Sequence, residues 1–388
     1  MKNPYKKMIS FVNAWCKKWK MAVNTDKTQV VHFRRQSALR TSFEFHMGNA
    51  NLQIVPNYKY LGVTFDEHLT FENNASILSN AAVRSLGQIR NKLKNLKECG
   101  YNSFNTLFTA GVLSIADYGA GVWGTKCFNK IEQVQYRAAR YFLGVHRFAP
   151  IHALLGDMGW CTAKTRHKIL SLKFWNRLCN LNENRITRKI FEWDLTYSTK
   201  RGTWCHAMKN LLYELGCSDI FNSSTPCDIE FASSVLYDRD SIEWDEGRYS
   251  SDKLRYYNLY KYDKDVESYL KLNISRYQRS ILAQFRCGIL PLQIEVGRYR
   301  DINLSERLCQ MCNQNVVEDE IHFLCDCACY SELRNDMFRT ATSIEQTFLE
   351  KDNIDKFVTL MSNNQKSVIY FLTRAIAKRT NLLNICNI

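Results

Sequence analysis

A cluster of soft metal ligands near the C-terminus constrains the fold of this chain more than any other feature. The stretch CQMCNQNVVEDEIHFLCDCACY, residues 309–330, places five cysteines and one histidine within 22 positions. Two thiolates separated by two residues, here Cys309 and Cys312, can hold one metal ion from a tight turn. A tetrahedral Zn²⁺ site then requires two further ligands of similar softness, so this segment is predicted to close on itself around a metal ion.

The remaining ligands follow from spacing. His322 is the available imidazole, and Cys325, Cys327 and Cys329 compete for the last position. Four residues separate His322 from Cys327, which is about one helical turn and suits a closing pair. The predicted ligands are Cys309, Cys312, His322 and Cys327. The alternative is that the cluster consists of reduced cysteines packed in a hydrophobic core.

Charge and ligand number indicate that this metal would be structural. Residues 301–335 carry seven acids against two arginines, a net charge of −5, and a Zn²⁺ ion with three thiolates adds a further negative charge. A module this negative does not attract phosphate, and four protein ligands leave no open position for a catalytic water. Any nucleic-acid contact in this region would come from the neighbouring Arg286, Arg298 and Arg300.

Cysteine usage and hydropathy predict the compartment. The chain has 15 cysteines, an odd number that is scattered outside the cluster, unlike the framework of a secreted disulfide-rich domain. The first twenty residues lack the apolar core of a signal peptide. The longest apolar stretch, LFTAGVLSIADYGAGVW, contains Asp117 and is too short to span a bilayer. We expect a reduced intracellular protein of the nucleus or cytoplasm, with no membrane partner.

The basic charge predicts a polyanionic partner. The net charge is +15, and two segments concentrate it: residues 1–40 hold ten Lys/Arg against one acid, and residues 161–190 hold eight against one. Aromatic residues alternate with these cations, a combination typical of surfaces that follow a phosphate backbone and stack on bases. RNA and DNA are the expected partners, and the alternative is a solvated basic face with core aromatics behind it. The cations expected to contact nucleic acid are Lys17, Lys18, Lys20, Arg34, Arg35, Lys92, Lys94, Arg137, Arg140, Lys164, Arg166, Lys168, Lys173 and Arg177.

Apolar periodicity predicts an α+β chain that is predominantly α-helical. Helices are expected at residues 5–20, from 73 to about 97, at 101–113, 131–145 and 163–181, around 254–290, and at 343–361 and 364–384. Gly144 is the expected stop of the helix at 131–145. A β-rich run is expected at 29–33, a β-hairpin with a Gly48-Asn49 turn at 42–55, and a buried strand at 58–65. Residues 217–252 are rich in Ser and Asp, which favours an irregular acidic linker.

Six stretches, taken in order, resemble one known family. They are WKMAVNTDKTQVVHF, YKYLGVTFDEHLTF, ADYGAGVWG, IEQVQYRAARYFLGVHRFAP, RCGILPLQIEVGRYR and ERLCQMCNQNVVEDEIHFLCDC. Together they resemble the C-terminal half of the reverse-transcriptase polyprotein of non-LTR (LINE-type, jockey-like) retrotransposons. The resemblance implies the end of the polymerase palm at 1–70, a helical thumb at 71–190, a helical connector at 191–300, a CCHC zinc module at 301–335 and C-terminal helices at 336–388.

The resemblance also implies roles for single residues. Lys27 lies in an Asn-x-x-Lys-Thr stretch whose lysine is a proposed proton donor to the departing pyrophosphate; without the resemblance it would be an ordinary turn lysine. Tyr60, Leu61 and Gly62 correspond to the primer grip, which holds the primer's 3′ end. The family's CCHC pattern also selects Cys327 as the fourth zinc ligand.

One departure from the family bears on activity. Polymerases hold two metal ions with carboxylates, and in this family these include an adjacent Asp-Asp pair, but the sequence has no Asp-Asp dipeptide. The sequence begins about where the family's chain resumes after that pair, so we expect the fingers and most of the palm to be missing. Mg²⁺ would then serve only the full-length enzyme, and this chain alone would bind a template–primer duplex without extending it. The alternatives are a co-opted, non-catalytic zinc-containing nucleic-acid-binding protein and a non-functional retroelement remnant.

Overall fold

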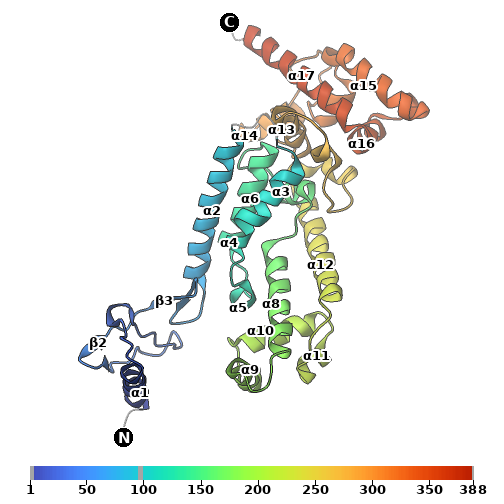
Figure 1. The fold of residues 1–388 in the computed structure, drawn as a ribbon. Helices are drawn as coiled ribbons and strands as arrows, with labels where there is room; N and C mark the ends of the chain where they lie inside the picture. The colour runs from blue at the N-terminus through green and yellow to red at the C-terminus, as the bar shows by residue number, and fades with distance from the viewer. Residues whose placement is uncertain (1–3, 95–98, 387–388) are drawn as a thin grey trace.

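The computed structural model describes residues 4–94 and 99–386, which form an elongated and mostly helical chain (Figure 1). Two small β-hairpins and an N-terminal helix lie at one end of the molecule, and the C-terminal helices lie at the other. This arrangement confirms the predicted α+β class with helix predominating. Within the described ranges, no helix has both the length and the apolarity needed to cross a bilayer.

The N-terminal region is loosely packed. Helix α1 (Pro4–Lys18) and the hairpin of β1 (Phe45–Met47) and β2 (Ala50–Leu52) form as predicted, with Gly48 at φ +63° in the turn. The apolar side chains that predicted a buried face of α1 remain in solvent, and the side chain of Phe11 is 71% exposed. Periodicity therefore identified the helix, but within residues 4–94 and 99–386 no segment covers its exposed apolar side chains.

Two strand predictions in the first seventy residues were wrong. Residues 58–65 form a second hairpin, β3 (Asn57–Tyr60) and β4 (Val63–Asp66), in place of one buried strand. The chain reverses at Leu61 and Gly62, where φ is +46° and +89°, and two successive positive values suit a tight hairpin turn. The run at 29–33 forms no strand and makes a single bridge, from Val30 to Ile54.

A helical body follows the hairpins. Its helices are α2 (Glu72–Lys94), α3 (Tyr101–Phe108), α4 (Ser114–Ala116), α5 (Ala120–Trp123), α6 (Asn129–Leu143), α7 (Ile151–Met158) and α8 (Ala163–Cys179). The helices predicted to begin near 73, 101, 131 and 163 are present, and a π-helical turn joins α3 to α4. The predicted end of the helix that begins near 73, which includes the apolar Leu96 and the basic Lys97, lies outside the described residues. Gly144 at φ +70° ends α6, as predicted.

The predicted acidic linker at 217–252 was also wrong. It contains α11 (Ser218–Ser223) and α12 (Ile229–Tyr249), which follow α9 (Ile186–Thr196) and α10 (Trp204–Glu214). Buried residues recur every fourth position along α12 and pack toward α7 and α8: they are Ala232, Leu236, Asp240, Trp244 and Arg248. Two of these residues are charged, so the composition of the segment did not indicate a buried helix face. The face is buried because α7 and α8 pack against it.

The C-terminal part contains α13 (Arg276–Arg286), α14 (Gln293–Tyr299), α15 (Ser331–Ile344), α16 (Asn353–Asn363) and α17 (Gln365–Cys386). The helix predicted at 364–384 is confirmed. The one predicted at 343–361 is interrupted, because Glu345 adopts an extended conformation and a 3₁₀ turn precedes α16. The helical pattern around 254–290 corresponds to short 3₁₀ turns before α13.

A buried ion-pair network joins α7 to α13. Arg286 is 2% exposed, and its guanidinium donates to both carboxylate oxygens of Asp157 at 2.9 and 2.8 Å and pairs with Glu267 at 2.8 Å. The hydroxyls of Tyr257 and Tyr269 donate to the same Asp157 carboxylate. The expectation that Arg286 contacts nucleic acid is therefore wrong, because its charge is used inside the protein.

Candidate metal centre and basic surfaces

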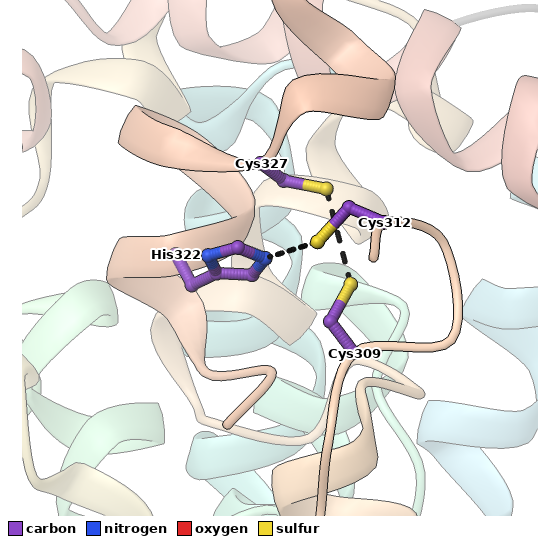
Figure 2. A group of neighbouring side chains, drawn as sticks. All are labelled: Cys309, Cys312, His322 and Cys327. Carbon is purple, nitrogen blue, oxygen red and sulfur yellow. Dashed lines mark hydrogen bonds between the residues drawn. The ribbon is translucent and has the colours of Figure 1, made fainter. Parts of the chain in front are cut away.

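The four predicted metal ligands come from two adjacent backbone segments. Cys309 and Cys312 lie in a turn that begins where Leu308 bridges Val317, and His322 and Cys327 lie at the two ends of a π-helical turn, His322–Asp326. Figure 2 shows the four side chains pointing toward a common centre. The ligand atoms all lie within 4.8 Å of one another.

The distances fit a tetrahedral zinc ion. Sγ of Cys309 lies 3.8 Å from Sγ of Cys327, and Sγ of Cys312 lies 3.4 Å from Nε2 of His322. With Zn–S bonds of about 2.3 Å and a Zn–N bond of about 2.0 Å, a tetrahedron separates two sulfurs by about 3.8 Å and sulfur from nitrogen by about 3.5 Å. The two distances match those of a tetrahedral site, so the donor set fits structural zinc.

Hydrogen bonds favour the thiolate form of Cys309 and orient the ring of His322. The thiol of Cys327 and the imidazole of His322 hydrogen-bond to Cys309 and hold the pKa of its thiol well below the usual range, although burial opposes the shift. The backbone N–H of Met311 also donates to Cys309 Sγ at 3.4 Å. Asp326 lies 3.3 Å from Nδ1 of His322 and leaves Nε2 facing Cys312, the orientation that a metal-ligating histidine needs.

The competing cysteines do not join the group. The four clustered ligands include Cys327 and exclude Cys325 and Cys329. Cys325 is buried in the hydrophobic core, and burial raises the pKa of its thiol to about 12. The local spacing argument selected the same four residues that the structure brings together.

Sequence reasoning missed the residues that anchor this centre. Glu318, fully buried next to Cys309, accepts hydrogen bonds from Arg379 of α17 at 2.8 Å and from the N–H of Gln293 at 2.8 Å. Arg334 of α15 donates to the carbonyl oxygen of Cys327 at 2.8 Å. No local pattern links Glu318 to a residue of α17, so only the tertiary fold reveals that the cluster ties α14, α15 and α17 together.

The residues assigned by family resemblance lie in the N-terminal region. Lys27 is exposed at the end of a 3₁₀ turn whose preceding residue, Asn24, accepts the Lys27 N–H through its side chain at 3.1 Å. Tyr60 and Leu61 are 59% and 75% exposed in the β3–β4 turn. A Cβ at Gly62 would lie 2.7 Å from the ring of Tyr118, so this position needs glycine for space as well as for its positive φ.

The first three cations of α8 have acidic partners from distant parts of the chain. Lys164 pairs with Glu243 at 2.9 Å and Lys168 with Glu214 at 3.3 Å. Arg166 donates to Asp117 at 3.0 Å and is largely enclosed. The predicted basic face of α8 is thus substantially neutralised, and Arg166 is occupied by a structural ion pair.

The other predicted nucleic-acid contacts divide into paired and unpaired groups. Arg34 forms an ion pair with Glu67 at 3.0 Å. Arg140 is half-buried, which lowers the pKa of its guanidinium, and its Nε has no hydrogen-bond partner among the described residues. Exposed members that form no ion pair within the described ranges are Lys17, Lys18, Lys20, Arg35, Lys92, Lys94, Arg137, Lys173 and Arg177.

Fold and site together define the class: a mostly helical protein with a buried Cys₃His group of structural-zinc geometry. No family model matches the chain, and no solved structure does either. A segment of 135 residues is 26% identical to a probable RNA-directed DNA polymerase from transposon BS of Drosophila melanogaster. The match covers 34% of this chain and 15% of that relative. It supports a relationship to retrotransposon reverse transcriptases.

Proposed function

We propose that this chain is the C-terminal portion of a non-LTR retrotransposon reverse transcriptase, and that it binds RNA and DNA as a template–primer duplex through its basic helices. The observation that carries the proposal is the similarity to the transposon polymerase. Residues 1–70 then end the palm, 71–190 form the thumb, 191–300 the connector and 301–335 the zinc module. The protein would act inside the cell, in the nucleus or cytoplasm.

Polymerisation is not expected of the chain alone. Phosphoryl transfer requires carboxylates that hold two metal ions, and the sequence has no Asp-Asp pair. Primer extension on an RNA template with Mg²⁺ tests this directly, with a reverse transcriptase of known activity as the positive control. Elongation by the isolated chain that depends on Mg²⁺ would contradict the assignment.

Duplex binding is the retained property. Fluorescence anisotropy with a labelled RNA–DNA hybrid should show affinity that falls as salt rises, because each phosphate contact releases counterions. A co-opted nucleic-acid-binding protein would share this behaviour but would act without a polymerase. A remnant without function would fail to bind the hybrid even at low salt, and that result would refute the proposal.

Cys309, Cys312, His322 and Cys327 would hold the zinc ion, which would cross-link the C-terminal helices. Metal analysis of the purified chain should find one zinc per chain, lost in Cys309→Ser and in Cys327→Ser. Cys325→Ser is the matched control and should keep its zinc, because Cys325 lies outside the group. Zinc retained at full occupancy in Cys327→Ser would refute this ligand set.

A further inference from the structure

We propose that a surface of cations spanning α2, α6 and the start of α13 is the part of the molecule that binds the phosphate backbone. This arginine surface consists of Arg90, Lys94, Arg137, Arg140 and Arg276. Arg90 and Arg276 share the ring of Tyr141, Lys94 lies one turn after Arg90, Arg137 lies one turn before Tyr141, and Arg140 lies beside Arg137. The inference rests on the proposed function and deepens it by naming the binding surface, which includes a helix that the sequence assigned to the connector. Figure 1 shows α2 and α6 side by side with α13 above them.

The arginine surface contains no acid. The segments 84–94, 133–150 and 273–288 include neither Asp nor Glu. None of its cations forms an ion pair within residues 4–94 and 99–386, whereas the first three cations of α8 all do. Unscreened charges of one sign on neighbouring helices raise the local positive potential, which attracts polyanions.

Tyr141 of α6 brings two of these arginines together. The guanidinium carbons of Arg90 and Arg276 lie 4.8 and 4.6 Å from the centroid of its ring. Each guanidinium is stabilised by the ring, but the two positive charges repel each other, and no described carboxylate compensates them. A phosphate placed between them would relieve that repulsion, and the planar fork of arginine matches phosphate oxygens.

The surface is held rigidly before any ligand arrives. Arg279 of α13 is buried and donates to the carbonyl oxygens of Phe142 at 2.9 Å and Cys99 at 3.2 Å. The hydroxyl of Ser280 donates to the carbonyl oxygen of Gly144 at 2.6 Å. These bonds fix the start of α13 against the end of α6, so binding does not require ordering of the helices.

The dimensions suit a duplex. Helix α6 has 15 residues, a length of about 22 Å, which matches roughly six base pairs of a helix that rises about 3.4 Å per step. The contacts would be to phosphates, independent of base sequence, because the ring of Tyr141 is already covered by guanidinium groups.

The test compares two triple variants of the full chain that remove the same charge. Arg90→Gln/Arg137→Gln/Arg276→Gln alters the arginine surface. Lys200→Gln/Arg201→Gln/Lys366→Gln removes three exposed cations elsewhere, none of them in an ion pair with a described residue. In anisotropy titrations with a labelled RNA–DNA hybrid, the first variant should lose affinity on the order of tenfold, with a salt slope reduced by roughly two to three. The second should stay within about twofold of wild type.

Each other outcome is decisive. If wild type binds and the arginine-surface variant binds equally well, this inference fails while the proposed function stands. If both variants weaken equally, only net charge matters and the inference fails. If wild type does not bind, both proposals fail. Displacement of the hybrid by poly-glutamate as effectively as by unlabelled hybrid would assign the surface to an acidic protein and overturn the inference.

Discussion

Helix α8 and the arginine surface look alike in sequence and differ in the folded protein. Both are rich in Lys and Arg, but Asp117, Glu214 and Glu243 pair with the first three cations of α8 from three other segments of the chain. No described acid forms an ion pair with the cations of the arginine surface. A run of positive charge therefore defines a polyanion-binding surface only when folding brings no carboxylates to it.

The largest expected effect concerns stability and separates the two regions clearly. Asp117→Asn leaves Arg166 enclosed without its counter-ion, and His167, 2.8 Å from the same carboxylate, loses a partner as well. Breaking such a pair should lower the free energy of unfolding by about 3 kcal/mol. Arg137→Gln on the exposed arginine surface should change it by less than about 0.5 kcal/mol. Urea denaturation followed by circular dichroism measures the free energy of unfolding of both variants. Equal losses would mean that the two regions do not differ in how their cations contribute to stability.

The second-largest effect is expected when an acid is added to the arginine surface, so that one of its cations becomes paired as the first three cations of α8 are. Gln133 is exposed on α6 one turn before Arg137, so Gln133→Glu would place a carboxylate at ion-pairing distance. Affinity for the RNA–DNA hybrid should fall about fivefold through neutralisation and repulsion of phosphate. Asn184→Asp, in the turn after α8, adds the same charge elsewhere and serves as control; an equal loss there would mean that the position of the charge is irrelevant.

A third variant pair tests how the arginines are positioned. Tyr141→Phe keeps the ring between Arg90 and Arg276 and should preserve both the affinity and its salt slope. Tyr141→Leu removes the cation–π contacts and should weaken binding about threefold with a smaller slope. A merely structural role for Tyr141 would lower the stability of the leucine variant and leave its salt slope unchanged.

The smallest effect is expected when the acidic partners of α8 are removed, so that its paired lysines become unpaired like the cations of the arginine surface. Glu214→Gln/Glu243→Gln frees Lys168 and Lys164 from their exposed partners and should raise affinity for the hybrid about twofold, since exposed ion pairs are weak. The control Glu183→Gln/Glu306→Gln adds the same net charge by removing two exposed acids that form no ion pair among the described residues. If the control gains as much, the pairing on α8 does not limit binding.

Predictions from the sequence succeeded where the information was local. The stop of α6 at Gly144 and the choice of Cys327 over Cys325 depend on spacing within a few residues, and both agree with the structure. The prediction failed for α12, whose buried stripe includes Asp240 and Arg248, because tertiary partners make those charges compatible with burial. From its composition alone, the segment was predicted to be an irregular acidic linker.

By itself, the sequence determined the predominance of helix, the four clustered ligands and the excess of positive charge. The tertiary structure decided which charges remain available: it enclosed Arg166 and Arg286 with carboxylates and left Arg90 and Arg276 converging on Tyr141 without one. The physical reason is range. Helix propensity and metal-ligand spacing act over a few residues, whereas an ion pair depends on which distant segments the fold places within a few ångströms.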